Sequence, residues 1–442
     1  MSQNTETIVA PATPTGHSAL AVVRASGPSC KKIAHELFQL DNLEPRKMHL
    51  ARWSDAAGAI DQLLVLFFPA PHSFTGEDLL EIFPHGNPLL VQKLLKEIAA
   101  FDRCRLAEPG EFTRRAYENG KIDLTQAEAI DAKIHAHTSE ALQLAQRLSE
   151  GKLSKAVELL KKQMEELSAQ VELEMDFAEE EGDPEMEQWP ASIEAMRDKI
   201  SVLLQGWERT QRVLRLPKVV LFGPPNAGKS SLANALLGEE RHLVSEQPGT
   251  TRDWIESHLV LPTGEIILCD TAGLGRAQDE LDSAAQKRTT RLLKNADIAV
   301  WVEDGRLPAT HPTPPSKETP LIRVRTRQAL PPFFPEEGAF SVDCKTEEGI
   351  SEFRRALQRE ILNRPPLSEN ALIATERQAD TLRRTDQLLE EAVALLQKRE
   401  RTTPELVAHL LRQSRDTLVT ITGEISDQEL LEKIFSRFCI GK

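Results

Sequence analysis

The fold is decided by one short stretch of sequence, Lys218-Val219-Val220-Leu221-Phe222-Gly223-Pro224-Pro225-Asn226-Ala227-Gly228-Lys229-Ser230. Its first five residues form a mostly apolar run of strand length, and a helical pattern follows through Leu237. The turn between them matches GxxxxGK[ST], in which glycines let the backbone wrap around phosphate with its N–H groups pointing inward. Lys229 would reach the β- and γ-phosphates of a nucleotide, and Ser230 would hold Mg²⁺ at the helix N-terminus. The stretch therefore predicts a nucleotide-binding domain.

Further segments follow in the order that a GTPase needs. Thr250 and Thr251 could supply the switch hydroxyl that completes Mg²⁺ coordination. Asp270-Thr271-Ala272-Gly273 comes after an apolar run, so its carboxylate could anchor the Mg²⁺ shell and its glycine N–H could contact the γ-phosphate. Asp343-Cys344-Lys345 stands where such domains touch the base. The order of these segments favours a GTPase.

One expected element is missing from this domain. GTPases read guanine with an Asn-Lys-x-Asp after a strand, but the strand candidate Leu321–Val324 leads into Arg325-Thr326-Arg327-Gln328-Ala329, which contains no carboxylate. Losing a charge-assisted hydrogen bond of this kind should weaken guanine selectivity by about 1.5–3 kcal/mol or more. We therefore expect relaxed or weak guanine preference.

The domain around the turn alternates strands and helices over residues 217–365, which is typical of a doubly wound α/β sheet. Eight prolines between Pro308 and Pro335 predict a largely irregular connection within it. The expected elements are strands at Lys218–Phe222, Glu265–Cys269, Ile298–Val302, Leu321–Val324 and Phe340–Val342, and a helix at Ser230–Leu237.

The flanking regions have different patterns. Residues 1–120 place short apolar runs between turn residues, which predicts an α+β domain with strands at Ala19–Val23, Leu63–Phe68 and Leu79–Phe83 and a helix at Leu89–Ala100. Residues 121–215 and 367–442 are helical in pattern, so we expect one discontinuous helical domain into which the α/β domain, 216–366, is inserted. Within it one apolar face predicts bundle core: Leu153, Val157, Leu160, Met164, Leu167 and Val171.

Two helix starts are also readable near the C-terminus. Thr403-Pro404 is typical of an N-cap followed by the first helical residue. Ser426-Asp427-Gln428-Glu429 matches a capping box, with Ser426 as the expected N-cap.

Composition limits the functional classes. The 442 residues carry a formal net charge of −14, so a stand-alone basic clamp on RNA is disfavoured. Nine of the acidic residues lie between Glu172 and Glu187 without an intervening Lys or Arg, so the acidity is a local block that would repel phosphate or dock a basic partner, or is simply a solvated turn. We expect no membrane span, since no apolar run approaches ~18–20 residues. No secretory signal is visible, and the five scattered cysteines point to a reducing, cytoplasmic location.

Beyond these patterns, the sequence closely resembles the tRNA modification GTPase MnmE (TrmE) family. The resemblance covers nearly the whole chain and extends to the C-terminal signature Phe438-Cys439-Ile440-Gly441-Lys442. The other matching segments are Thr7–Ala10 with Ala12–Pro14, Ser73–Asp78, Pro109–Phe112, Lys121–Leu124 with Gln126–Ala129, Pro225–Ser231 and Gly249–Asp253.

The resemblance implies an α+β N-terminal folate-binding and dimerisation domain, a discontinuous α-helical domain and an inserted α/β P-loop G domain. It implies a homodimer that forms a heterotetramer with the FAD-dependent protein MnmG (GidA). Together they would add a carboxymethylaminomethyl or aminomethyl group to C5 of the wobble uridine, U34, of certain tRNAs, whose contact is shared between the partners. The implied cofactors are GTP, Mg²⁺, K⁺ and a tetrahydrofolate derivative, in the 5,10-methylene or 5-formyl form.

The resemblance also assigns residues. For folate these are Arg24, Glu81, Lys121 and Lys442, for magnesium Ser230 and Thr251, and for potassium Asn226, Ser245, Gln247 and Thr250. The implied catalytic residues are Lys229, Asp282 and Cys439, the last as a nucleophile toward the uracil ring or an incidental cysteine. The full nucleotide-binding set is Asn226, Ala227, Gly228, Lys229, Ser230, Ser231, Ser245, Glu246, Gln247, Pro248, Gly249, Thr250, Thr251, Asp270, Thr271, Ala272, Gly273, Asp343, Cys344 and Lys345.

The chain departs from the family at a position that bears on hydrolysis. Members usually carry a Glu after the second switch motif to orient the attacking water, whereas Asp282 stands here. Its side chain is shorter by one methylene, roughly 1.5 Å, and catalysis is sensitive to a misplacement of ~1 Å. We therefore expect slow hydrolysis.

Two other functions compete with the modification enzyme. One is a dimeric folate- and partner-binding scaffold whose G domain hydrolyses weakly or has relaxed nucleotide specificity. The other is a ribosome-assembly GTPase, which the N-terminal and C-terminal matches disfavour.

Overall fold

Contacts along the chain divide it into two units. The computed structural model describes residues 5–181, 188–238, 255–271, 289–310, 312, 316, 319–362, 371–398, 403–425 and 427–442. The first unit comprises Met1–Asp131, Arg147–Leu204 and Ile373–Lys442, and the second comprises Ala132–Gln146 and Gln205–Leu372. None of the described helices is both long and apolar enough to cross a membrane.

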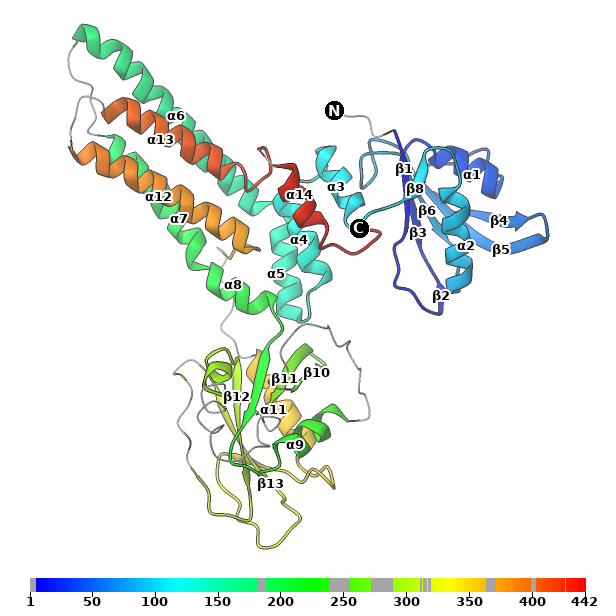
Figure 1. Cartoon of the computed structure of the whole chain (residues 1–442), viewed down its shortest axis with the longest axis vertical. Coiled ribbons are helices and arrows are strands. Elements are labelled where there is room, and N and C mark those ends of the chain that lie inside the picture. The colour runs from blue at the N-terminus through cyan, green and yellow to red at the C-terminus, as the bar shows by residue number, and fades with distance from the viewer. Residues whose placement is uncertain are drawn as a thin grey trace. The chain divides into compact units, whose positions relative to one another are not determined.

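The N-terminal part of the first unit is built on a six-stranded sheet (Figure 1). The strand order is β4-β5-β6-β3-β1-β8, antiparallel except for the parallel pair β1 and β8. The strands are β1 (Thr7–Pro11), β3 (Val23–Ser26), β4 (His49–Asp55), β5 (Gly58–Phe68), β6 (Leu79–Phe83) and β8 (Cys104–Leu106); β2 (Ser18–Leu20) and β7 (His85–Gly86) pair separately. The strand expected at Ala19–Val23 is wrong, because the chain breaks there into β2 and β3, which join different sheets.

Both faces of this sheet are covered. Helices α1 (Cys30–Phe38) and α2 (Pro88–Ala99) pack on one face, where apolar side chains of the helices and strands form a common core around Trp53. On the opposite face Phe112, from α3 (Glu111–Glu118), packs against strand residues such as Ile8. The expected α+β arrangement is confirmed for this part of the chain.

Helices make up the rest of the first unit (Figure 1). Helix α13 packs against both α6 and α12, and the expected apolar face of α6 is confirmed, since all six of its residues are at most 4% exposed. The helices are α4 (Leu124–Ile134), α5 (Ser139–Ser149), α6 (Lys152–Glu181), α7 (Trp189–Gln205), α12 (Glu376–Lys398), α13 (Thr403–Leu418) and α14 (Gln428–Phe435); α4 runs on into the second unit, to which most of α5 belongs.

One helix start differs from expectation. The N-cap of α14 is Asp427, whose side chain accepts a hydrogen bond from the Glu429 N–H, and the expected cap, Ser426, lies outside the described residues. Asp is as good an N-cap as Ser, so the helix can begin one residue later than expected.

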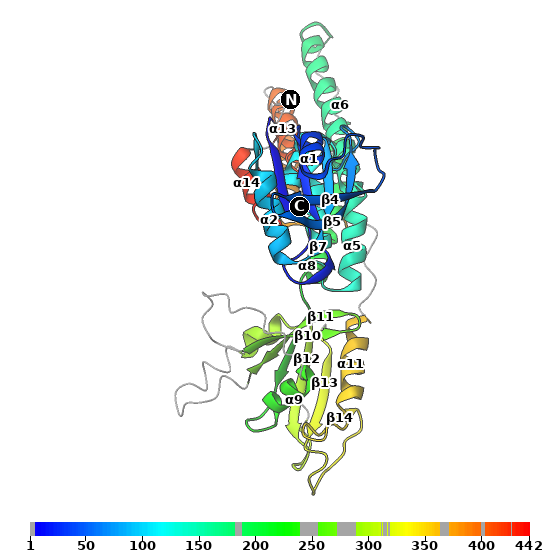
Figure 2. The same ribbon diagram turned by 90° about the vertical axis from the view of Figure 1, so that its right-hand side faces the viewer.

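The second unit contains the expected α/β sheet. Figure 2 shows its strands with α9 (Lys229–Leu237) and α11 (Ile350–Leu362) beside them. The order is β10-β11-β9-β12-β13-β14, parallel throughout except for the antiparallel edge pair β10 and β11. The strands are β9 (Lys218–Phe222), β10 (Ile255–Leu261), β11 (Gly264–Asp270), β12 (Ile298–Asp304), β13 (Leu321–Thr326) and β14 (Ala339–Ser341), and α8 (Trp207–Leu214) precedes them.

Successive residues of β9 point to opposite faces of this sheet. Val219 and Leu221 belong to the core that also holds Leu232 of α9 and Phe353 of α11. Val220 belongs to a second core on the other side, with Leu292 and Ala296. A parallel strand buried on both faces is expected in a doubly wound fold, so that prediction is confirmed.

The start of β11 is bound to the connection between α4 and α5. Thr138 and Gly264 form a β-bridge, and the Glu265 N–H donates to the His137 carbonyl at 2.8 Å. The Glu265 carboxylate also contacts the Nδ1 atoms of His137 and His258. Within the second unit, this connection is therefore part of the α/β body.

Arg115 occupies the inside of the N-terminal part and is only 1% exposed. Its Nη1 and Nη2 atoms donate to Glu77 Oε2 and Glu111 Oε1, each at 3.0 Å, and Nη1 also donates to the Glu6 carbonyl at 2.9 Å. Buried charge pairs of this kind are costly to break, because the remaining partner loses its compensation in a dry environment.

We predict that Arg115→Ala lowers the free energy of unfolding of this part by about 3–5 kcal/mol. The matched control is Arg114→Ala, one residue away on the same helix, where a partly exposed pair with Glu118 contributes at most about 1 kcal/mol. Urea unfolding of the full chain followed by tryptophan fluorescence measures both. Equal losses for the two variants would contradict the prediction.

Candidate functional site

The glycine-rich turn leaves the buried strand β9 and enters α9 at the carboxyl edge of the sheet's central strands. Gly223 has φ of +147°, and a Cβ there would lie 2.0 Å from the Val302 carbonyl oxygen. Gly228, with φ of +92°, and Asn226, with φ of +62°, also have left-handed backbone. The turn is therefore tightly curled and pressed against β12, which only glycine permits at Gly223.

Lys229 is the first residue of α9 and is 7% exposed. Its ammonium donates to the carbonyl oxygens of Gly223 at 3.0 Å and Pro224 at 2.8 Å, so the side chain folds back over the turn. Burial lowers the pKa of Lys229, and the nearby Asp270 carboxylate partly offsets that effect. A positive charge held over a phosphate-sized turn is what a P-loop requires.

The second motif meets the turn through sheet register. β11 lies parallel to β9 with Asp270 opposite Leu221, so the carboxyl ends of both strands reach the same edge. Asp270 is 6% exposed, and the Thr271 hydroxyl donates to the Leu221 carbonyl at 2.9 Å. The structure thus brings Asp270 and Thr271 to the same edge as Lys229 and the exposed Ser230 and Ser231.

Several expected nucleotide residues lie outside the described residues. These are Ser245, Glu246, Gln247, Pro248, Gly249, Thr250 and Thr251 of the first switch, and Ala272, Gly273 and Asp282 of the second. Their assigned roles stay predictions.

The segment after β13 is fastened to the turn by two residues that the sequence analysis did not select. The Thr326 hydroxyl donates to the Ala227 carbonyl at 2.7 Å. Arg327, with φ of +65°, donates from Nη2 to the Asn226 carbonyl at 3.0 Å and pairs through Nη1 with Asp304 at 3.2 Å. Thr326 and Arg327 lie in the segment Arg325–Ala329, where the Asn-Lys-x-Asp motif was expected, and that position after a strand was the available signal.

The Asp343 carboxylate accepts hydrogen bonds from nearby backbone N–H groups. The donors are the N–H groups of Lys345 at 2.9 Å, Thr346 at 3.1 Å and Ala329 at 3.2 Å. Burial alone would raise the pKa of Asp343, but these backbone donors outweigh it and hold the pKa below its usual range. Burial, with Asp343 beside it, raises the pKa of the Cys344 thiol to about 11. The segment Asp343-Cys344-Lys345, expected to contact the base, is therefore hydrogen-bonded to the exposed Ala329, which has no carboxylate of its own.

A buried ion pair joins β12 and β13 near the carboxyl edge of the sheet. Arg325 is fully buried and donates from Nη1 to Glu303 Oε1 at 2.7 Å and from Nη2 to the Leu307 carbonyl at 2.6 Å. Glu303 also accepts from the Thr310 N–H and hydroxyl. These contacts hold the proline-rich connection against the ends of β12 and β13.

In the first unit, Arg24 and Glu81 face each other across β3 and β6. Arg24 donates to Glu81 Oε1 from Nη2 at 2.7 Å and Nε at 3.1 Å, and its guanidinium carbon lies 5.9 Å from the centre of the Phe112 ring. Both side chains are under one-fifth exposed. A cation, a carboxylate and an aromatic face are thus brought together.

The C-terminal signature reaches this pair. Arg24 Nη1 donates to the Gly441 carbonyl at 3.4 Å, and the Phe112 N–H donates to the Lys442 carbonyl at 3.2 Å. Cys439 is exposed, and its carbonyl accepts from the Lys442 N–H. Lys121 lies on a different loop contact, with Nζ donating to the Pro71 carbonyl at 2.9 Å. Arg24, Glu81 and the chain end are therefore gathered, while Lys121 supports the loop before Gly76.

We predict that Gly223→Ala lowers the affinity for a fluorescent guanine nucleotide at least tenfold, because the new Cβ would collide with the Val302 carbonyl and displace the turn. Gly238→Ala at the other end of α9 is the matched control: its φ is +60°, but nothing lies within 4 Å of the added carbon. Its affinity should stay within about twofold, since the backbone strain of about 1–3 kcal/mol expected at Gly238, where ψ is −157°, lies at the far end of α9 from the turn. Similar losses in both variants would argue against a phosphate-binding role for the turn.

Comparison with known proteins covers the same regions. The family model for the GTP-binding protein TrmE N-terminus matches residues 7–121, and that for the MnmE helical domain matches residues 124–439. The chain is 36% identical to the tRNA modification GTPase MnmE of Chlorobium chlorochromatii, over 100% of this chain and 99% of that one.

Two further relatives carry the same name. That of Thermus thermophilus is 36% identical, with 98% of each chain covered, and that of Alkalilimnicola ehrlichii is 38% identical, with 99% of each covered. Matches of this extent, together with the P-loop edge and the gathered C-terminal signature, show that the chain belongs to the tRNA modification GTPase MnmE family.

Proposed function

We propose that this protein is a GTP hydrolase that acts in the modification of tRNA. The observation that carries the proposal is the carboxyl edge of the second unit's sheet, where the Lys229 ammonium folds over the Gly223 turn and Asp270 lies on the adjacent strand. The relatives that match over the full length are named for the same activity.

The residues of this edge have separable roles. Lys229 and the N–H groups of the turn would bind the β- and γ-phosphates, and the N-terminus of α9 favours their negative charge. The Ser230 hydroxyl and the Asp270 carboxylate are hard oxygen donors, which suit Mg²⁺. The exposed Asn226 would contribute to K⁺ binding. Bound cations would supply the positive charge that offsets charge developing on the transferred phosphoryl group.

The finer parts of the proposal concern the tRNA chemistry. We infer that the protein works as a homodimer with an FAD-dependent MnmG partner at C5 of the wobble uridine, with a tetrahydrofolate derivative as one-carbon donor. The Arg24–Glu81 pair beside Phe112 fits such a ligand, because a pterin offers hydrogen-bond donors to a carboxylate and its glutamate tail needs cations such as Lys442. All five cysteines are free, which supports work in the reducing cytoplasm.

Mass spectrometry of tRNA nucleosides tests this function. Deleting the gene should remove the C5 modification of wobble uridine. Expressing the wild-type chain in the deletion strain should restore the modification, whereas expressing the Lys229→Ala variant should not restore it. Purified protein should hydrolyse GTP faster in K⁺ than in Na⁺, because the smaller ion fits the same ligands poorly. If the tRNA nucleosides are the same with and without the gene, the proposal is rejected.

A scaffold function is the second candidate, favoured by one observation. At the position where a guanine-reading carboxylate would stand, Ala329 offers only its N–H, and that N–H is already bonded to Asp343. Nucleotide could then be bound with weak base selectivity and turned over slowly, while the first unit binds folate and partner.

We predict that Ala329→Asp raises the preference for GTP over ATP by about tenfold or more, since a charge-assisted hydrogen bond to the base contributes about 1.5–3 kcal/mol. The loop that would hold the new carboxylate is already fastened to the turn by Thr326 and Arg327. Combining it with Asp343→Asn removes the repulsion between neighbouring carboxylates. Competition binding of GTP and ATP measures the preference, and Ala329→Asn is the uncharged control. A wild-type chain that already rejects ATP as strongly as Ala329→Asp would contradict the prediction.

A further inference from the structure

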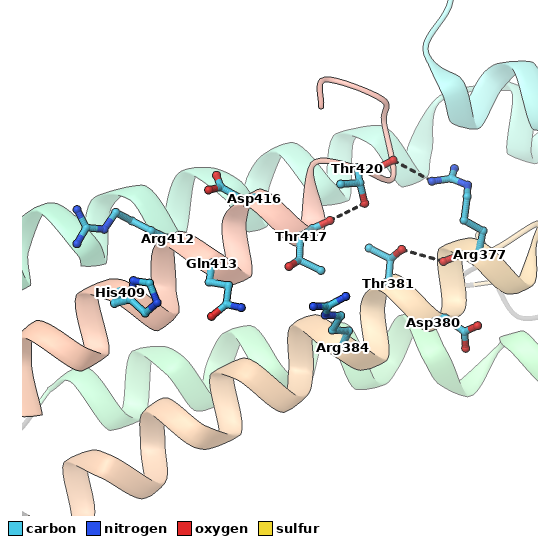
Figure 3. Close-up of a pocket in the computed structure, with 10 residues that line it drawn as sticks. All are labelled: Arg377, Asp380, Thr381, Arg384, His409, Arg412, Gln413, Asp416, Thr417 and Thr420. Carbon is cyan, nitrogen blue, oxygen red and sulfur yellow. Dashed lines mark hydrogen bonds between the residues drawn. The ribbon is translucent and has the colours of Figure 1, made fainter. Parts of the chain in front are cut away.

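An open groove of about 910 Å³ lies between α12 and α13 of the first unit (Figure 3). Its ten lining residues are three arginines, a histidine, a glutamine, three threonines and two aspartates, with no apolar side chain. Nothing in the nucleotide or folate chemistry above uses them. The core of a protein–protein interface is normally apolar and aromatic, so this lining indicates a polar ligand.

The two aspartates of the groove already have cationic partners. Asp380 accepts from Arg383 Nη1 at 2.7 Å, and Asp416 accepts from Arg415 Nη2 at 2.6 Å. These two arginines stand on the same helices but do not line the groove. Both pairs lie at the surface, so they offset the negative charge of the lining only in part.

Arg377 forms a fixed end of the groove. It donates to both carboxylate oxygens of Glu128, from Nε at 3.0 Å and from Nη2 at 2.8 Å, and from Nη1 to the Thr420 carbonyl at 2.8 Å (Figure 3 shows the last bond). With its donors used in this way, Arg377 shapes the groove and is not available to a ligand.

Arg384 and Arg412 are the available cations. Arg384 is exposed and makes no hydrogen bond or ion pair with any residue in the part of the chain that the structure describes. Figure 3 shows its side chain pointing into the space between the helices, with Gln413 pointing back toward it from α13. Arg412 pairs with Glu172 at 3.4 Å, but these side chains are 52% and 49% exposed, and such surface pairs are weak.

We propose that this groove binds RNA backbone phosphates, those of the tRNA substrate, through Arg384 and Arg412, with His409 and Gln413 as further donors. Guanidinium groups match phosphate oxygens in a bidentate geometry, and side-chain amide donors such as that of Gln413 also make phosphate contacts. The tRNA identity of the RNA rests on the proposed function. An acidic protein segment could use the same cations and the same N–H donors, and RNA is favoured because the proposed function already requires a tRNA substrate.

A small cationic groove also suits the charge of the whole chain. With a formal net charge of −14, the protein cannot attract RNA through its overall field, so contact must depend on a few local cations. Each phosphate contact contributes about 0.7–0.9 to the slope of log affinity against log salt. Two arginines therefore predict a modest, countable salt dependence.

The test measures binding of full-length protein to fluorescent tRNA at several NaCl concentrations. The double variant Arg384→Glu with Arg412→Glu should weaken binding at least tenfold and reduce the salt slope by about one to two. Its matched control is Arg52→Glu, a charge reversal at an exposed arginine of β4, which should change affinity less than about twofold. GTP turnover and the melting temperature should be the same in all of these proteins.

Three outcomes would overturn the proposal. The first is unchanged tRNA affinity in the double variant. The second is loss of binding to polyglutamate with tRNA binding intact, which would assign the groove to an acidic protein partner. The third is wild-type protein that does not bind tRNA at all, which removes the RNA role of the groove but leaves the proposed modification activity to be judged separately by nucleoside mass spectrometry.

Discussion

The nucleotide edge depends on one close approach, that of the Gly223 backbone to the Val302 carbonyl. No side chain fits between them, since a Cβ would stand 2.0 Å from that oxygen. The turn can therefore leave β9 only by curling back over the sheet edge, which brings the carbonyl oxygens of Gly223 and Pro224 within reach of Lys229. The position of the ammonium, and of the Asp270 carboxylate on the neighbouring strand, follows from packing of backbone against backbone.

At this edge, the residues that attach the loop after β13 to the glycine-rich turn are not the residue that would recognise the base. In many GTPases one segment after a strand performs both, but here Thr326 and Arg327 still hold that segment to the turn while Ala329 lacks the carboxylate. Phosphate binding can thus keep its geometry when base selectivity is lost, because the two depend on different residues. Asp343 adds a third attachment by accepting from the Ala329 N–H, at the point where the guanine-reading carboxylate is absent.

Sequence patterns predicted the local features well and the long-range ones poorly. The strand Lys218–Phe222 and the apolar face of α6 are confirmed because they follow from spacing along one element. The role of Asp343 could not be predicted, since its partner Ala329 comes from another strand's loop. Resemblance suggested Arg24 and Glu81 separately. Only the register of β3 against β6 shows that these two residues, 57 positions apart in sequence, form a pair.

The start of β11 shows why such long-range constraints matter for the site. That strand carries Asp270 at its carboxyl end and Gly264 at its beginning, where a Cβ would lie 2.2 Å from the His137 carbonyl. The strand is also held at that end by the Glu265 N–H, which donates to the same carbonyl. Asp270, which we propose holds Mg²⁺, and Gly264, which lies against the α4–α5 connection, are therefore the two ends of one strand of seven residues. Because a strand does not stretch, the position of the carboxylate and the position of the bridge to Thr138 are fixed together.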